Sequence, residues 1–308
     1  MKKLIVAVLV AVLVLVLITP AVLAKPDMDK PLPATDVQLV KKVTLHGKPG
    51  GSGGGKPAKQ AATGVLGEQL GTGANKYAVL VGISNYPGEE NDLQYCDDDA
   101  KDMNSALTTL YGYNSSNIHL LLDMDASFNA TKDAIDDIKS QAKAGDEVVF
   151  FFSGHGTKAV ADDGDKERMD EAIVSHDGNP SGSLIAIWDG QLMDWFSGFN
   201  TSRIIFIFDS CLAGGMTDLQ APGRIINMAC SESGLSYEGN WGENGDFTYF
   251  FVDQGTLGGK ADRYDHDTDG VFSEAKDVTV EEAFDYAKAN CQMQKPTISD
   301  SFSDDLLL

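Results

Sequence analysis

The chain has 308 residues, of which 46 are acidic and 24 are basic, so its formal net charge is −22 at pH 7. This excess of negative charge argues against nucleic acid as a partner, because phosphates are bound by basic surfaces. It would instead attract basic substrates and calcium ions. Nothing in the sequence indicates an oligomeric state.

The first 24 residues have the pattern of a secretory signal peptide. Two lysines precede fifteen apolar residues, 4–18, and a Val22-x-Ala24 cleavage signature follows Pro20. We therefore expect a secreted protein or one held in the cell envelope. The alternative is an uncleaved membrane anchor, since residues 4–24 reach the length of about 20 residues that spans a bilayer. Membrane association is expected only in that case.

Residues 25–75 are rich in glycine, proline and lysine, with GKPGGSGGGKP at their centre. Such a composition buries too little apolar surface to offset the entropy lost on folding. We expect a linker or a propeptide here. Residues 76–308 are long enough for one large domain with its own core.

Within residues 76–308, apolar runs bounded by turn residues predict strands, and amphipathic segments between them predict helices. The expected strands are 77–83, 118–122, 148–152, 203–208 and 224–229. The expected helices are 98–110, 130–144, 190–196, 247–254 and 280–290. Because strands and helices alternate, we expect an α/β fold with a mostly parallel sheet flanked by helices.

Two of these strands end in chemically reactive residues. VVFFFSGHG places His155 and Gly156 after one strand, and RIIFIFDSC places Cys211 after another. The carboxyl ends of the strands are where α/β sheets bind ligands. A cysteine nucleophile needs a base, and histidine is the usual one. The sequence predicts that His155 is the base, that Cys211 is the nucleophile, and that the amides of Gly156 and Cys211 form an oxyanion hole.

Each residue also has a purely structural interpretation when it is considered singly. A histidine after a strand is often a turn residue or a core residue with satisfied hydrogen bonds, and a free cysteine is among the most buried residue types. The two motifs together carry the functional prediction.

SGHG and DSC-x-x-GG resemble the caspase, metacaspase and paracaspase group of cysteine peptidases. The resemblance extends over residues 76–308, because five further blocks are similar to prokaryotic caspase-like domains: KYAVLVGISNYPG, NDLQYCDDDA, DEAIVSHD, FTYFFVDQGTLGGKAD and QKPTISD. It implies a caspase-like (caspase-hemoglobinase) fold and a cysteine-type endopeptidase that acts on protein or peptide substrates. No organic cofactor is expected.

The resemblance also implies a substrate pocket. In metacaspases and their relatives this pocket is lined by an acid two residues before the cysteine and by a Cys-x-x-Asp element. Here Asp209 is that acid, and Cys96 with Asp99 reproduces the element. A buried pair of carboxylates needs a cation, so we expect cleavage after arginine or lysine.

Two alternatives of other kinds remain open. One is a peptidase of the same fold that cleaves after asparagine or aspartate, as in legumains and caspases, although Asp99 and Asp209 argue against it. The other is a non-catalytic, calcium-stabilised surface protein, which would need neither His155 nor Cys211.

Calcium is the expected cofactor, and an EF-hand-like loop is the first candidate site. In DHDTDGVFSEAKD the ligands fall at loop positions one, three, five and nine, which are Asp265, Asp267, Asp269 and Ser273. Lys276 stands at the twelfth position, where a bidentate glutamate is needed, so Glu274, Asp277 or Glu282 would have to replace it.

A second calcium site is implied by the resemblance alone. Asp170, Asp177 and Asp189 resemble the acidic positions around which metacaspases bind an activating calcium ion. The pattern departs from the usual doubled aspartate, because Trp188 precedes Asp189.

The four cysteines are Cys96, Cys211, Cys230 and Cys291. A secreted protein permits a bridge between Cys230 and Cys291, but the spacing does not establish it.

Overall fold

The computed structural model describes residues 26–45, 59–164, 169–178 and 184–308. The predicted signal peptide, residues 1–24, lies outside these ranges. Within them, every helix is too short or too polar to cross a bilayer.

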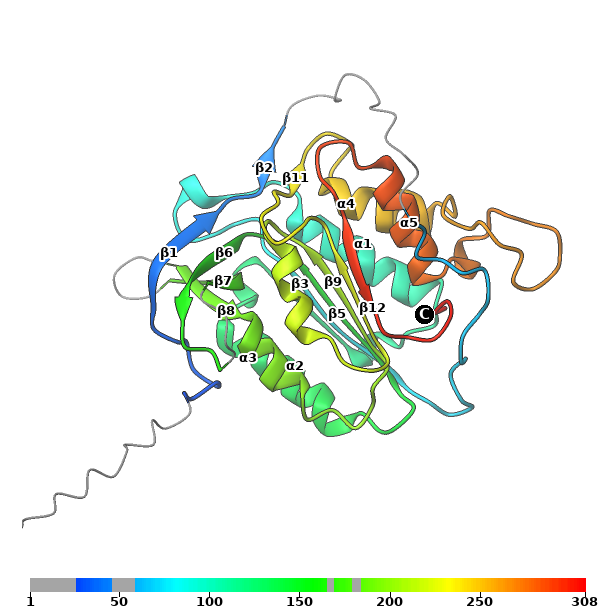
Figure 1. The fold of residues 1–308 in the computed structure, drawn as a ribbon, viewed down its shortest axis with the longest axis horizontal. Helices are drawn as coiled ribbons and strands as arrows, with labels where there is room; N and C mark the ends of the chain where they lie inside the picture. The colour runs from blue at the N-terminus through cyan, green and yellow to red at the C-terminus, as the bar shows by residue number, and fades with distance from the viewer. Residues whose placement is uncertain (1–25, 46–58, 165–168, 179–183) are drawn as a thin grey trace, which may run out of the picture.

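A six-stranded sheet crosses the centre of the molecule (Figure 1). Its order is β12-β10-β9-β5-β3-β4, and only β12 runs antiparallel to its neighbour. The strands are β3 (Lys76–Gly82), β4 (Ile118–Leu122), β5 (Glu147–Ser153), β9 (Ile204–Asp209), β10 (Arg224–Met228) and β12 (Thr297–Asp300). The predicted mostly parallel sheet is confirmed.

Successive side chains of these strands point into two different cores, because a strand alternates its faces. In β3, Val79 and Val81 belong to one core, while Ala78 and Leu80 belong to the other. Both faces are buried under helices, which explains why the strands are apolar without interruption.

Helices cover both faces of the sheet. The first core is closed by α2 (Phe128–Gln141) and α3 (Asp189–Phe196). The second is closed by α1 (Cys96–Thr109), α4 (Asp246–Thr248) with the π-helix η5 (Tyr249–Leu257), and α5 (Val280–Asn290). Short 3-10 turns are η1 (Glu89–Asn91), η2 (Ser115–Asn117), η3 (Asp123–Asp125), η4 (Ala213–Leu219) and η6 (Ala275–Asp277). Ser127 caps α2, and Thr279 with Glu282 forms a capping box on α5.

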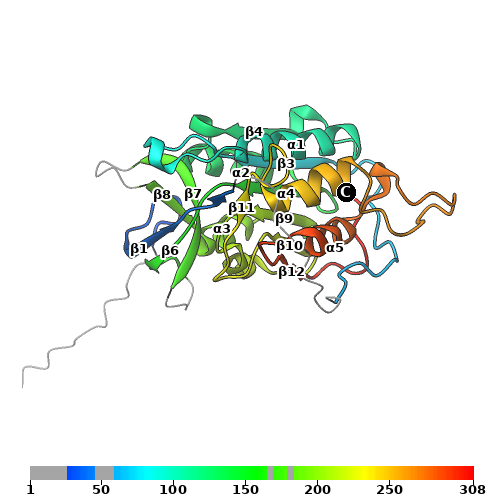
Figure 2. The same ribbon diagram turned by 90° about the horizontal axis from the view of Figure 1, so that it is seen from above.

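A second, four-stranded antiparallel sheet was not predicted from the sequence. Its order is β1-β6-β7-β8, and it lies to one side of the main sheet in both views (Figures 1 and 2). The strands are β1 (Ala34–Val40), β6 (Gly156–Ala161), β7 (Asp170–Gly178) and β8 (Leu184–Trp188).

Part of residues 25–75 packs against the domain, although their composition predicted too little buried surface for this; their role as a linker or propeptide stays a prediction. Strand β1 pairs with β6, and β2 (Val43–Thr44) pairs with β11 (Tyr237–Glu238). The attachment uses backbone hydrogen bonds and a few buried side chains, which are Met28, Lys42 and Ala62, so composition gave little sign of it. Residues 46–58 lie outside the described ranges.

Candidate functional site

His155 and Cys211 lie at the carboxyl edge of the six-stranded sheet, as predicted. Strands β5 and β9 are parallel neighbours, and their register pairs Ser153 with Asp209. Each reactive residue follows its strand by two positions, so the two emerge side by side. Both are buried, with exposed fractions of 0% for His155 and 1% for Cys211.

Gly156 lets the two segments approach each other. A Cβ atom at this position would lie 2.0 Å from the carbonyl oxygen of Cys211, which no side chain can accept. The residue after the cysteine, Leu212, has a left-handed φ of 61°, a conformation that costs a non-glycine residue about 1–2 kcal/mol. The close contact between Gly156 and Cys211 and the strained backbone of Leu212 therefore lie together at the predicted oxyanion hole. The role of the two amides stays a prediction.

The ring of His155 is held on three sides. It stacks on Tyr86 with a centroid separation of 4.7 Å, and its Nε2 lies 2.7 Å from the carbonyl oxygen of Asn91. Its Nδ1 accepts a hydrogen bond of 3.2 Å from the backbone N–H of Lys42. Burial lowers the pKa of His155 to about 4, so the imidazole is neutral in this state.

The thiol of Cys211 also faces the backbone next to Lys42. Its Sγ lies 3.4 Å from the carbonyl oxygen of Lys41 and accepts a hydrogen bond of 3.2 Å from the backbone N–H of Ser236. Burial raises the pKa of Cys211 to about 11. Among the described contacts, no hydrogen bond joins this thiol to His155, and both bind the peptide group between Lys41 and Lys42. Because the pKa of His155 is lowered and that of Cys211 is raised, both side chains are uncharged in this state.

The residues of the predicted substrate pocket lie together, and a cation lies among them. The ammonium of Lys42 lies 3.0 Å from Asp209 Oδ1 and 3.5 Å from Asp99 Oδ2, and all three side chains are fully buried. The same Nζ lies 3.1 Å from Ser153 Oγ and 3.7 Å from the sulfur of Cys96. The structure thus brings together all three predicted pocket residues around one lysine.

Several pocket residues were missed by sequence reasoning. Asp209 accepts hydrogen bonds from the hydroxyls of Ser236 and Thr248, and Asp99 accepts them from Ser153 Oγ and Gly245 N. These donors come from distant segments and share no spacing, so no pattern could have grouped them. Burial and the neighbouring Asp209 raise the pKa of Asp99 to about 7, although Lys42 opposes this shift.

The first predicted calcium loop does gather its acids. Single carboxylate oxygens of Asp265, Asp267 and Asp269 lie within 4.8 Å of one another, and a second set of this kind is Asp267, Glu274 and Asp277. Glu282 is used in the cap of α5, and the role of Ser273 as a ligand stays a prediction. Of the candidates for the missing twelfth ligand, Glu274 and Asp277 are the ones that approach.

The second predicted set, Asp170, Asp177 and Asp189, is not among the carboxylate clusters found in the described residues. Asp177 accepts from Phe128 N, and Asp170 Oδ2 accepts from Ala161 N at 2.8 Å. Burial, followed by the neighbouring Asp163, raises the pKa of Asp189 far above its usual range. The three carboxylates thus have separate partners, which the sequence spacing could not show.

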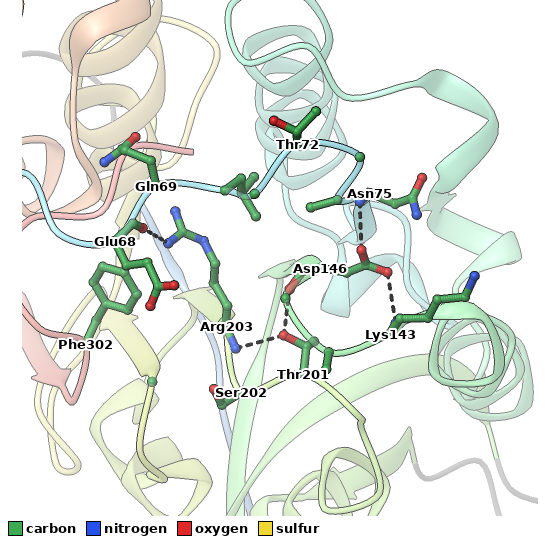
Figure 3. Close-up of a pocket in the computed structure, with 17 residues that line it drawn as sticks. Glu68, Gln69, Thr72, Asn75, Lys143, Asp146, Thr201, Ser202, Arg203 and Phe302 are labelled. Carbon is green, nitrogen blue, oxygen red and sulfur yellow. Dashed lines mark hydrogen bonds between the residues drawn. The ribbon is translucent and has the colours of Figure 1, made fainter.

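A hollow of about 600 Å³ lies elsewhere in the structure (Figure 3). It is formed by the loops that precede β3, β5 and β9, at the opposite edge from His155 and Cys211. Its polar groups bind one another: Arg203 bonds to Glu147 and to the carbonyl oxygen of Glu68, and Asp146 accepts from the amide of Asn75. This hollow has no convergent reactive groups.

All four cysteines are free in the structure. The sulfur of Cys230 faces the carbonyl oxygen of Ser210, and that of Cys291 faces the carbonyl oxygen of Asp246. The possible bridge between them is therefore not formed here.

A parallel α/β sheet that presents a cysteine, a histidine and a buried acidic pocket at its carboxyl edge has the features expected of a caspase-like peptidase domain. Comparison with known proteins agrees. Residues 76–220 match the family model described as the metacaspase, peptidase C14 domain. Residues 76–220 therefore form a caspase-like cysteine peptidase domain of the metacaspase type.

The curated relatives include Metacaspase-4 of Arabidopsis thaliana, which is 36% identical over 151 residues, or 46% of this chain and 34% of the relative. Metacaspase-1 of Scheffersomyces stipitis is 33% identical over 156 residues, or 47% of this chain and 37% of the relative. The chain thus spans about a third of the length of these relatives.

Among solved structures, the chain is similar to protein GSU0716 from Geobacter sulfurreducens. The TM-score is 0.53 at 16% identity, with 73% of this chain and 92% of the other covered. This similarity concerns the fold.

Proposed function

We propose that this protein hydrolyses peptide bonds after lysine or arginine, with Cys211 as nucleophile and His155 as base. The observation that carries the proposal is the ammonium of Lys42 between Asp99 and Asp209, 3.5 Å and 3.0 Å away. The pocket beside the cysteine accommodates a long basic side chain in full burial.

The electrostatics of this pocket favour a cationic side chain over an anionic one. Leaving one partner of a buried ion pair unmatched costs about 3–5 kcal/mol. An aspartate in the pocket would add a third carboxylate to Asp99 and Asp209 and make that cost larger. Asparagine would leave both unmatched. The alternative specificity for asparagine or aspartate is therefore disfavoured.

The reaction needs a substrate peptide in place of the Lys41–Lys42 peptide. His155 would take the thiol proton of Cys211 as sulfur bonds to the substrate carbonyl carbon, and the amides of Gly156 and Cys211 would stabilise the oxyanion. The imidazole would then give that proton to the leaving amine. Water, deprotonated by the same ring, would cleave the thioester and restore the thiol.

We also propose that the protein acts outside the cytoplasm and binds calcium. The pattern of residues 1–24 supports the first, and the gathering of Asp265, Asp267 and Asp269 supports the second. Carboxylate oxygens are the ligands that calcium prefers, and Glu274 or Asp277 would complete the set.

A library of fluorogenic peptides that vary the residue before the cleaved bond tests the proposal. Wild type and Cys211→Ala should be compared with and without calcium. We expect hydrolysis after lysine and arginine in wild type and none in the variant. Hydrolysis after aspartate or asparagine alone would overturn the pocket assignment.

A further inference from the structure

The N-terminal segment 39–45 runs directly across the candidate active site. On one side, β1 pairs with β6 up to Val40, which lies opposite Gly156. On the other side, the amides of Val43 and Leu45 donate to the carbonyl oxygens of Ser236 and Glu238, at 3.0 Å and 2.9 Å. Lys41 and Lys42 bridge the two pairings, so the chain lies where a substrate would have to bind.

Lys42 anchors this segment from the middle. Its side chain enters the acidic pocket, and the neighbouring Asp209 and Asp99 hold its pKa well above the usual range in spite of burial. Gly245 forms the wall of the pocket, since a Cβ there would lie 2.6 Å from Lys42 Nζ. The fit leaves no room for a second side chain.

The contacts on either side of Lys42 reinforce the anchor. The hydroxyl of Thr44 donates to Glu238 Oε1 at 2.6 Å, and the same oxygen accepts from the backbone N–H of Gln94 at 3.0 Å. The neighbouring Lys41 points outward and bonds to the carbonyl oxygen of Glu90. Two adjacent lysines thus have opposite environments.

The described polar contacts of the dyad go to the peptide group before Lys42 and not to the bond after it. Hydrolysis there requires the sulfur at the carbonyl carbon of Lys42 and the imidazole at the nitrogen of Val43. Instead Cys211 faces the carbonyl oxygen of Lys41, His155 faces the nitrogen of Lys42, and the nitrogen of Val43 bonds to Ser236. The dyad is engaged with the preceding peptide group, and its proton donors and acceptors are occupied.

We propose that residues 39–45 are a built-in inhibitor of this peptidase, with Lys42 as the side chain that occupies the specificity pocket. This inference rests on the proposed function, whose active site the segment blocks. Because the inhibitor belongs to the same chain, it acts at an effective concentration of about millimolar or above. Activity therefore requires that the segment leave the cleft.

The first experiment measures amine reactivity in the native wild-type protein. Brief acetylation by an N-hydroxysuccinimide ester, followed by digestion and mass spectrometry, compares Lys42 with its neighbour Lys41. Burial should protect Lys42 by about tenfold or more. Equal labelling of the two lysines would overturn the inference, whatever the enzymatic activity.

The second experiment releases the anchor with Lys42→Ala and uses Lys30→Ala as a control with the same change in charge. The side chain of Lys30 is exposed and, among the described residues, forms an ion pair with Asp27. We expect Lys42→Ala to increase the alkylation rate of Cys211 and the hydrolysis of lysyl peptides by about tenfold or more over wild type. Lys30→Ala should leave both unchanged.

The two readouts separate the two proposals. Faster alkylation of Cys211 in Lys42→Ala without any hydrolysis would refute the proposed function and support the blocked cleft. Hydrolysis that is equal in wild type and Lys42→Ala, with equal alkylation, would refute the inhibitor and leave the function standing. Folding of the variant is checked by its thermal unfolding, and the acetylation test in wild type does not depend on it.

Discussion

Two acidic regions of this molecule use the same residue type in opposite ways. In the pocket, Asp99 and Asp209 are completely buried and share one ammonium. In the loop that includes Asp265, Asp267 and Asp269, the carboxylates are partly or fully exposed. The loop extends from the end of the molecule away from the four-stranded sheet (Figures 1 and 2). In the loop, water and salt screen the repulsion between the carboxylates. In the buried pocket, only a cation can offset it.

The difference predicts where a substitution matters. An acid in the pocket selects the charge of its ligand, because the energy of an unmatched buried charge is large. An acid in the loop gains energy only when an ion binds and contributes little otherwise.

The first prediction tests whether the acidic pocket lies beside a working catalytic dyad. We expect Cys211→Ala to abolish peptide hydrolysis and His155→Ala to reduce it by about three orders of magnitude or more, since catalytic groups act as a unit. Both variants should be measured in the Lys42→Ala background, where the cleft is open. Near-native turnover in either would remove the assignment of the dyad.

The sharpest comparison is between one acid of each region. In the Lys42→Ala background, Asp209→Asn should lower kcat/KM for arginyl peptides by about 10²–10³, which corresponds to the loss of one partner in a buried ion pair. Asp267→Asn, assayed without calcium, is the matched control and should change it less than about twofold. Similar effects at both positions would contradict the account.

A third acid extends the contrast to a buried carboxyl without a cation. Glu281 is fully buried, and burial raises its pKa to about 9. The folded chain thus holds a proton that the unfolded chain loses above about pH 4.5, so the free energy of unfolding should fall as pH rises from there towards 9. Glu281→Gln should remove this fall.

The corresponding measurement is denaturant unfolding across this pH range. At pH 8 we expect Glu281→Gln to be more stable than wild type by about 1–3 kcal/mol. The two proteins should converge near pH 4.5. A variant that is less stable at every pH would mean that the Glu281 carboxylate is matched by a group in the folded protein.

The smallest expected effect concerns the loop. Asp267 belongs to both carboxylate sets, so Asp267→Asn should weaken calcium binding by about tenfold. Isothermal titration of the full chain measures this directly, with Asp36→Asn as an exposed acid outside the loop. An unchanged affinity would place the ion elsewhere, and no binding in wild type would remove the calcium proposal.

The sequence was most informative where burial is continuous. The predicted bounds of β4 and α5 agree with the structure, and those of β5 and β9 differ by one residue at each end, because strands covered on both faces must be apolar throughout. The four-stranded sheet escaped prediction. Its strands β1 and β8 are half exposed, and pairing with β6 and β7 arises from backbone contacts between distant segments.

In the candidate site, too, some residues could be predicted from the sequence and one could not. Asp99, Asp209, His155 and Cys211 stand in local motifs, so their positions follow from short stretches of sequence. Lys42 stands in no motif. Its place in the pocket depends on strand pairings on both sides of the cleft, which are tertiary contacts that a composition rich in glycine and proline conceals.

If the buried acids set the specificity, it can be read from kcat/KM of Lys42→Ala for four peptides that differ only in the residue before the cleaved bond. We expect rapid hydrolysis after lysine and arginine, loss of both in the double variant with Asp209→Asn, and neither aspartyl nor asparaginyl cleavage. Preference for aspartate or asparagine, or lysyl cleavage that survives Asp209→Asn undiminished, would contradict the pocket assignment.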